Sequence, residues 1–162
     1  MQRARKLSKR GLRDKAAEFI VEGATGVSEA LRAGASISVV FVDPASGERI
    51  ANVAADAEAK GLRVLEVSDP IMRLISGATT PPGIIAVSRF VDKPVEAVLA
   101  RQFDVALVLA DVRDPGNVGT ILRTAWATGV GAVFMGKGSA DVYNPKVVRS
   151  AAGALFDLWV AR

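Results

Sequence analysis

The 162-residue sequence has half of its residues hydrophobic, a net charge of +4, and neither cysteine nor histidine. These absences exclude disulfides, thiolate chemistry and Cys-based zinc sites, and they remove the commonest general base and metal ligand, so we expect no metal site. No apolar run approaches the roughly 20 residues that cross a bilayer, and no signal-peptide core follows the basic N-terminus. We therefore expect a cytoplasmic protein with no membrane partner.

The first fifteen residues concentrate the positive charge. They hold seven Lys or Arg residues and one Asp, a net of +6, whereas residues 16–162 sum to −2. Such a block is a candidate contact for a phosphate polymer, because each neutralised phosphate releases condensed counterions. A solvated, partly disordered terminus is the alternative, and no interleaved aromatic residue indicates base stacking. The candidate contacts are Arg3, Arg5, Lys6, Lys9 and Arg10.

Short β-branched segments alternate with helical patterns up to residue 90. The predicted strands are 18–23, 36–43, 62–68 and the part of 79–90 that follows a turn beginning at Thr79. The predicted helices between them are 26–34, 46–61 and 69–77. The last of these opens with an Asp-Pro pair, a good cap and first residue, and closes at Gly77. This alternation predicts a small α/β layer domain over residues 1–90.

A second α/β unit is predicted over residues 105–162, after a linker at 91–104 that carries a proline and mixed charge. Its predicted elements are strand 105–112, loop 113–119, helix 120–128, strand 131–136, a helix from about Pro145 and strand 154–160. Its continuous apolar strands are typical of a parallel sheet covered on both faces. A final apolar strand with nothing after it would face water, so we expect a partner chain to cover it or part of the domain to be absent.

The segment "DPGNVGT", residues 114–120, follows the first strand of the second unit, where open parallel sheets bind ligands. We expect a tight turn, in which Asn117 and Gly119 can adopt positive φ and Gly119 permits a close backbone approach, followed by a helix whose N-terminus suits a phosphate. Arg123 would reach the same space. An ordinary strand-to-helix turn with a surface arginine is the alternative. The segment matches neither the GxxxxGK[ST] phosphate loop nor the GxGxxG dinucleotide fingerprint.

Two long segments, "DPGNVGTILRTAWATGVGAVFMG" and "DVYNPKVVRSAAGALFDLWV", closely resemble the first motif and the next helix of the SpoU (TrmH-type) RNA ribose methyltransferases of the SPOUT superfamily. Upstream, "RDKAAEFIVEG", "VSEAL" and "TTPPGIIAV" resemble the small L30e-like substrate-binding domain of many such enzymes. The resemblance covers most of the chain. It implies an L30e-like domain followed by the first half of a SPOUT α/β-knot domain with a Rossmann-like parallel sheet.

The resemblance also implies a reaction, a methyl transfer from S-adenosylmethionine to a ribose 2′-hydroxyl of RNA. The family's motif assigns Arg123 as the activator of that hydroxyl and Asn117 as a residue that positions the arginine and the substrate. Residues 144–153 resemble the part of the family that lies beside RNA, with Asn144, Lys146 and Arg149 as candidate contacts. A helix N-terminus with a solvated basic face is the alternative for these three. Tyr143 and Trp126 are interpreted as packing residues rather than base-stacking platforms.

The chain departs from the family pattern at its C-terminal end. The family's second and third motifs, a "GSEG"-like loop and an "SLNVS"-like segment, form the knot and the methyl-donor pocket, and neither occurs in these 162 residues. We therefore expect the chain alone to be inactive, with its cofactor-binding residues unassigned. Because family members work as dimers, a homodimer is expected for the full-length protein.

The function predicted from the sequence is thus an RNA 2′-O-ribose methyltransferase, with rRNA favoured over tRNA because the extra N-terminal domain is commoner among rRNA enzymes. A non-catalytic RNA-binding module with a degenerate methylase remnant is the alternative from another class. A nucleotide-binding protein that uses residues 113–119 as its phosphate loop is a weaker rival. The target nucleotide cannot be predicted from the sequence.

Overall fold

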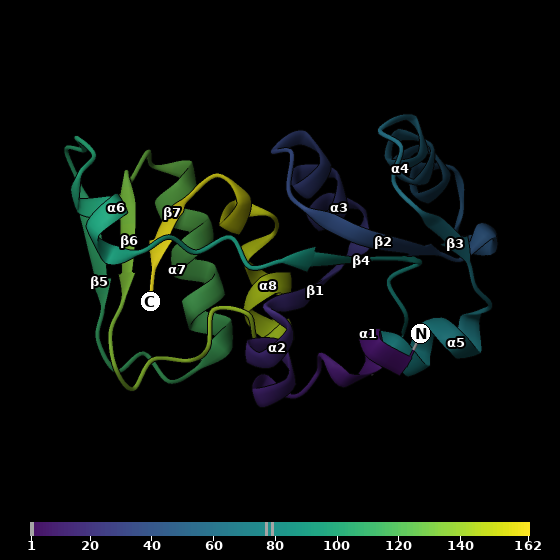
Figure 1. Cartoon of the computed structure of the whole chain (residues 1–162), viewed down its shortest axis with the longest axis horizontal. Coiled ribbons are helices and arrows are strands. Elements are labelled where there is room, and N and C mark those ends of the chain that lie inside the picture. Colours follow the sequence, from purple (N-terminus) through teal and green to yellow (C-terminus); the bar gives the residue numbers. More distant parts are fainter. Residues whose placement is uncertain (1, 77, 79) are drawn as a thin grey trace. The chain divides into compact units, whose positions relative to one another are not determined.

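The computed structural model describes residues 2–76, 78 and 80–162, so the predicted helix end at Gly77 and turn start at Thr79 lie outside the described residues. The chain divides into two compact units, residues 1–90 and 91–162. Each is a mixed α/β domain with its own sheet, as expected (Figure 1).

The sheet of the first unit has four strands, β1 (Glu18–Glu22), β2 (Ile37–Val42), β3 (Val64–Glu66) and β4 (Ile84–Arg89). Their order is β1-β4-β2-β3. Strand β4 lies antiparallel to β1 and to β2, whereas β2 and β3 are parallel. All four strands were predicted from their β-branched composition, but the pairing of the first strand with the last was not.

Helices cover both faces of this sheet. Helices α3 (Gly23–Arg32) and α4 (Glu48–Ala59) lie on one face, and the short helix η1 (Pro44–Ser46) precedes α4. Helices α1 (Gln2–Lys6), α2 (Arg10–Ala16) and α5 (Asp69–Ser76) lie on the other face (Figure 1). On the second face, Ala4 and Leu7 pack into a cluster with Phe41, Met72 and Ile85 of the sheet and α5. The N-terminal segment is therefore part of the core, and the alternative of a solvated, disordered terminus is wrong.

Two arginines fix this N-terminal segment in place. The buried guanidinium of Arg13 donates from Nη1 to the carbonyl oxygens of Leu7 and Ser8, each at 2.8 Å, so it holds the connection between α1 and α2. The exposed Arg3 forms an ion pair at 2.8 Å with the buried carboxylate of Glu18 on β1. The basic residues are thus carried on two ordered helices rather than on a flexible tail.

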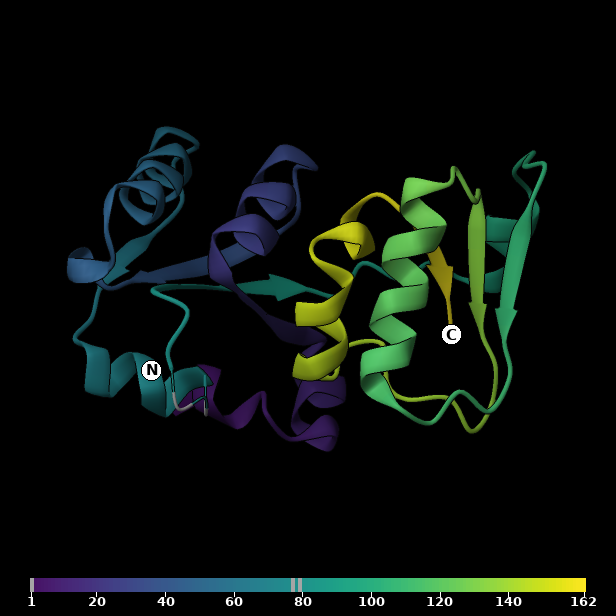
Figure 2. The same cartoon turned by 180° about the vertical axis from the view of Figure 1, so that it is seen from behind.

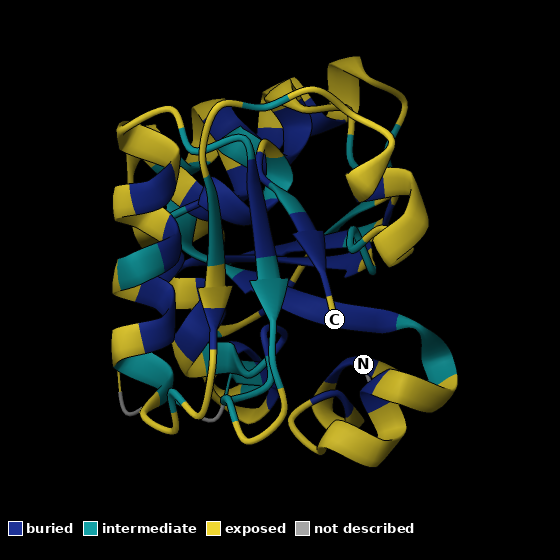
Figure 3. Ribbon diagram, turned by 90° about the vertical axis from the view of Figure 1, so that its left-hand side faces the viewer, coloured by how far each residue is buried: buried dark blue, intermediate teal, exposed yellow. Residues whose placement is uncertain are grey.

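The second unit contains a parallel sheet of β5 (Ala106–Leu109), β6 (Ala132–Met135) and β7 (Trp159–Ala161), in that order. Helices α7 (Pro115–Ala127) and α8 (Pro145–Ala151) lie together beside it (Figure 2). Burial rises across the sheet from β5, whose Val108 is 70% exposed, to β7, whose Val160 is 1% exposed (Figure 3).

Two expectations for the second unit differ from the structure. Residues 91–104 are not merely a linker, because helix α6 (Val95–Leu99) packs Val98 against β6 and β7, and the Lys93 N–H bonds to the Val160 carbonyl oxygen at 2.8 Å. The predicted strand 154–160 is instead a short 3₁₀ helix, η2 (Ala154–Phe156), followed by the brief strand β7. The Arg101 guanidinium also lies 4.0 Å from the centre of the Trp159 ring. Strand β7 is therefore covered by this chain's own residues 91–104.

The packing role expected of Tyr143 is clear from its hydrogen bonds. Its hydroxyl donates to Asp92 Oδ1 at 2.5 Å and accepts the backbone N–H groups of Val91 and Asp92, each at 2.7 Å. The other oxygen of Asp92 accepts Nε of Arg162 at 2.9 Å. Burial, with the hydrogen bond to Asp92, raises the pKa of Tyr143 well above its usual range, so the hydroxyl remains a donor. This network ties residues 91 and 92 to the start of α8.

Replacement of Tyr143 by Phe should destabilise the second unit by about 1–3 kcal/mol, because it leaves two backbone N–H groups and a carboxylate oxygen short of a partner. Both tryptophans, Trp126 and Trp159, belong to this unit, so urea denaturation followed by tryptophan fluorescence measures its stability selectively. Equal stability of the variant and the wild type would show that the hydroxyl makes no net contribution.

Candidate functional site

Two loops at the carboxyl ends of β5 and β6, residues 110–114 and 136–144, are bonded to each other. The hydroxyl of Ser139 donates to the carbonyl oxygen of Leu109 at 2.8 Å and accepts the N–H of Val112 at 3.1 Å. The N–H of Ala140 donates to the Val112 carbonyl oxygen at 2.9 Å. The approach to α7 is therefore fixed at the sheet edge where parallel α/β folds bind ligands.

The backbone of Asp111 is the strained point of these loops. Its φ of 57° lies in the left-handed region, which residues with a side chain adopt infrequently. Its two carboxylate oxygens accept Nε and Nη2 of Arg113 at 2.8 and 2.9 Å. A Cβ atom at Gly138 would collide with the Asp111 side chain. Such strain persists where the surroundings determine it, and it is concentrated at functional sites.

Helix α7 begins five residues earlier than predicted. Asp114 is its N-cap, with a side-chain oxygen that accepts the Asn117 N–H at 2.8 Å, and Pro115 is the first helical residue. The expected loop at 113–119 is therefore wrong. Asn117 and Gly119 lie in the helix, and neither uses the positive φ that it could adopt. The hydrogen bond from Asn117 lowers the pKa of Asp114, and the charge of Lys146 adds to this effect.

The lowered pKa of Asp114 predicts a pH dependence. The pKa of Asp114 in the folded state lies below the unfolded value of about 4. The stabilisation of the fold by its ionised carboxylate is therefore present above pH 4 and is lost as the pH falls through the folded pKa. Asp114→Asn keeps a good N-cap but cannot titrate, so its stability should change less with pH over this acidic range. Urea midpoints by tryptophan fluorescence, at several pH values below 5, measure the difference. Parallel pH profiles for the two proteins would contradict the prediction.

Helices α7 and α8 pack closely, with their N-termini at the same end. A Cβ at Gly116 would lie 3.4 Å from Cε of Lys146, and one at Gly119 would lie 2.6 Å from the carbonyl oxygen of Val147 and would collide with the Ser150 hydroxyl. That hydroxyl already donates to the Lys146 carbonyl oxygen at 2.7 Å. Gly119 does permit a close backbone approach, as expected, but the approaching group belongs to α8.

The predicted catalytic residues both lie on the exposed side of α7. Asn117 and Arg123 are exposed, and six residues of α-helix separate them by roughly 9 Å along the axis and about 120° around it. They therefore do not form a compact pair. Asn117 lies at the carboxyl edge of the sheet, and Arg123 lies further along the helix with a long side chain in solvent.

The three predicted contacts on α8 have different environments. Asn144 is the N-cap, and its Oδ1 accepts the Lys146 N–H at 2.9 Å. The Lys146 ammonium lies 3.4 Å from Asp114 Oδ2, so it links the starts of the two helices. Arg149 is exposed on the last turn. Of these residues, Lys146 and Asn144 lie beside the start of α7.

Profiles of known protein families match both units. The MRM3-like substrate binding domain matches residues 1–86, and the SpoU rRNA Methylase family matches residues 104–162. The chain belongs to the SpoU rRNA methylase family.

Named relatives agree with this assignment. The chain is 36% identical over 154 residues to "rRNA methyltransferase 3A, mitochondrial" of Danio rerio. The matched region covers 92% of this chain and 34% of the relative. The chain is 32% identical over 158 residues to "23S rRNA (guanosine(2553)-2'-O)-methyltransferase RlmP" of Bacillus subtilis, which covers 98% of this chain and 59% of the relative. The crystal structure of an AdoMet-bound rRNA methyltransferase from Sinorhizobium meliloti matches with a TM-score of 0.85 and 29% identity, over 99% of this chain and 60% of that one.

The SpoU chain therefore spans about a third to 60% of the length of these relatives. The structural match confirms the expected fold class of the two α/β units. Over the described residues, no helix combines the length and apolar character needed to cross a bilayer. The same residues contain no cluster of three or more potential ligands that could hold a metal ion.

Asp114 is the residue of the candidate site that the sequence-based prediction missed. It caps α7 by accepting the N–H of Asn117 and it pairs with Lys146, so it connects two of the predicted site residues. The Asp-Pro pair that correctly placed the start of α5 at Asp69 occurs again at residues 114 and 115. Had the same cap signature been applied there, it would have placed the start of α7 correctly.

Proposed function

We propose that this chain provides the substrate-binding domain and the RNA-facing start of the catalytic domain of an S-adenosylmethionine-dependent rRNA 2′-O-ribose methyltransferase. The observation that carries the proposal is the helix α7, which begins at the carboxyl edge of a parallel sheet, with Asn117 in its first turn and Arg123 on its exposed side further along, in a unit that matches the SpoU family. The Bacillus subtilis relative is named as a 2'-O-methyltransferase of 23S rRNA, and this supports the 2′-hydroxyl of rRNA as the acceptor.

Arg123 is proposed to clamp the phosphate beside the target ribose and to stabilise the alkoxide as it develops. A guanidinium stays protonated near neutral pH, so electrostatic stabilisation fits it better than general-base catalysis. Its exposed position on α7 allows its fork of N–H donors to meet phosphate oxygens in a bidentate manner. Deprotonation of the 2′-hydroxyl by a neutral Arg123 is the alternative mechanism.

Asn117 and Lys146 are proposed to orient the RNA beside Arg123. The backbone N–H of Asn117 is used by the Asp114 cap, and its amide side chain is exposed at the first turn of α7. Lys146 is held toward the same place by Asp114, and Asn144 caps the neighbouring helix. Alignment of the reacting groups is a large source of rate acceleration, so the fixed geometry of these two helix starts supports a positioning role.

S-adenosylmethionine, the group bound in the Sinorhizobium meliloti structure, would supply the transferred methyl group. At the carboxyl edge of the sheet in the second unit, polar groups of the two loops are already bonded to one another. Ser139 bonds to residues 109 and 112, and Asp111 bonds to Arg113. The residues present therefore do not by themselves form a set that fits the donor, and we assign none of them to it.

The partner proposed for this protein is rRNA, and its proposed assembly is a homodimer in the cytoplasm. Support for the dimer comes from apolar side chains exposed on the second unit, with Leu99 61%, Val105 52% and Val108 70% exposed. Exposed apolar groups gathered on one unit are typical of interaction surfaces. The size of the complete protein by light scattering tests the dimer.

The function is tested by incubating the complete protein that contains this chain with rRNA and radiolabelled S-adenosylmethionine. The expected result is labelled RNA that resists alkaline cleavage at one position. A methylated 2′-oxygen cannot attack the adjacent phosphate, which is the step that cleaves RNA in alkali. RNA binding without any methyl transfer would favour the non-catalytic binding module. Tight binding of ATP or NAD without RNA binding would favour the nucleotide-binding protein.

A further inference from the structure

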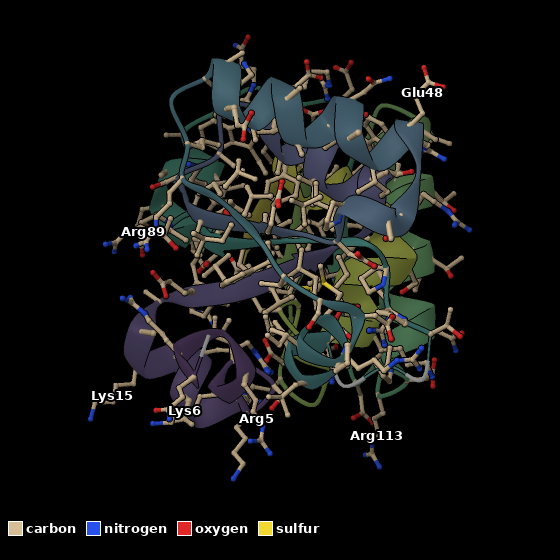
Figure 4. The ribbon with its side chains drawn as sticks, turned by 90° about the vertical axis from the view of Figure 1, so that its right-hand side faces the viewer. Arg5, Lys6, Lys15, Glu48, Arg89 and Arg113 are labelled. Carbon is tan, nitrogen blue, oxygen red and sulfur yellow. The ribbon has the colours of Figure 1, made fainter. Side chains whose placement is uncertain are left out.

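The first unit contains a groove between α1 and α2 that the proposed chemistry does not use. Its volume is about 520 Å³, within the range of sites that hold a small molecule or one nucleotide. Leu7, Leu12 and Ala16 provide apolar lining, and Arg3, Lys6 and Lys15 provide cations. Figure 4 shows Lys6 and Lys15, together with Arg5, projecting from these helices into solvent.

The groove is held open by the fold. Arg13 is buried, and its two 2.8 Å hydrogen bonds to the carbonyl oxygens of Leu7 and Ser8 set the connection between the helices. Ala4 and Leu7 anchor α1 in the core, while Leu12 remains 37% exposed. A partly exposed leucine in a preformed groove offers apolar contact to a ligand without a cost of rearrangement.

The charges of the groove favour an anion. No Asp or Glu is among its described lining residues. The Arg3 side chain is 70% exposed although its Nη2 pairs with Glu18, so much of the guanidinium stays accessible. On the other side of α1, Arg3 also lines a second hollow of about 260 Å³, together with Arg63 and Ser38. Cations therefore continue from one hollow to the next across α1.

We propose that this groove binds an unpaired stretch of RNA, with one nucleotide base against Leu12 and Ala16 and the flanking phosphates on Arg3, Lys6 and Lys15. The inference rests on the proposed function, because it assigns the surface through which the first unit holds the substrate. In a duplex the bases are stacked inside, so only an unpaired strand places a base on the apolar lining.

The test uses the 162-residue chain and fluorescence anisotropy with a labelled single-stranded RNA of mixed sequence, the same RNA annealed to its complement, and an acidic peptide of Glu and Leu. The single strand should bind more tightly than the duplex. For Lys6→Ala/Lys15→Ala, the slope of log affinity against log salt should become shallower by about 1.4, since each single-strand phosphate contact contributes about 0.7. Leu12→Ala should weaken single-strand binding roughly threefold to tenfold, from the lost apolar contact, with an unchanged salt slope.

Lys60→Ala, which removes an exposed cation at the end of α4, is the matched control and should change neither quantity. Circular dichroism checks that each variant is folded. Duplex binding as tight as single-strand binding, or a Leu12→Ala protein that binds like the Lys60→Ala control, would overturn the proposal. Displacement of the RNA by lower concentrations of the acidic peptide would assign the groove to a protein partner instead. Because these measurements need no methyl transfer, their result is independent of the assay for the proposed function.

Discussion

Arg123→Ala should lower the single-turnover rate of RNA methylation by roughly 10²–10³, the scale for losing one key electrostatic stabiliser of a developing negative charge. The side chain is exposed on α7, and the helix core at this level is made by Leu122 and Ala125, so the fold should be unaffected. Single-turnover rates with saturating RNA and methyl donor, measured on the complete protein, give the chemical step directly.

Conservative and neighbouring variants separate the possible roles of Arg123. Arg123→Lys keeps the charge but loses the planar fork, so it should recover only part of the rate if the residue clamps a phosphate. Asn117→Ala should be impaired to a smaller extent. Thr124→Ala, one residue along the exposed side of the same helix, should retain the wild-type rate. A folded Arg123→Ala protein with the wild-type rate would remove this residue from the mechanism.

Gly119→Ala should destabilise the second unit by about 3 kcal/mol or more, the upper end of the range for overpacked sites. The added Cβ would lie 2.6 Å from the Val147 carbonyl oxygen and would also meet Cβ and the hydroxyl of Ser150. Helices α7 and α8 would have to separate, and the Lys146 ion pair with Asp114 would be stretched. Urea denaturation followed through the two tryptophans measures the loss.

Two further variants show whether the close approach of α7 and α8 causes the loss of stability in Gly119→Ala. Gly119→Ala/Ser150→Gly removes the side-chain collision but not the one with the Val147 carbonyl, so it should recover only part of the stability. At Gly11 in α2 no atom lies within 4 Å of an added Cβ, so Gly11→Ala should stabilise its helix by about 0.5–1 kcal/mol. A stable Gly119→Ala protein would mean that the two helices do not pack as described.

Local signals predicted most of the elements, because strands and helices in this chain are marked by composition and caps. The helix α5 starts at Asp69 as its Asp-Pro pair predicts, and β5 and β6 follow their apolar runs. The prediction of a strand at 154–160 was wrong at its start. Ala152 and Gly153 adopt positive φ there, and residues 154–156 form a 3₁₀ helix. Apolar composition alone does not distinguish such a turn from a buried strand.

Long-range contacts could not be predicted from local patterns. The high charge of residues 1–15 gave no indication that Ala4 and Leu7 are buried in the core. For the candidate site, Asn117 and Arg123 were named from a motif, but their place on the exposed side of a helix depends on where the Asp114 cap starts it. The Tyr143 bonds to residues 91 and 92 join positions about fifty residues apart, and no sequence spacing indicates them.

The order β1-β4-β2-β3 has a consequence for the way the chain emerges from the ribosome. Strand β1 lies at the edge of its sheet and pairs with β4, so Glu18 remains without its partner position until Arg89 has been synthesised. The parallel pair β2 and β3 needs only residues up to Glu66, so it can assemble earlier. Because pairing across such sequence distances is slow, closure of β4 between β1 and β2 should be the late step in folding of the first unit. Helix α1 is therefore synthesised well before the strand β4, whose Ile85 belongs to the core cluster that holds Ala4 of this helix.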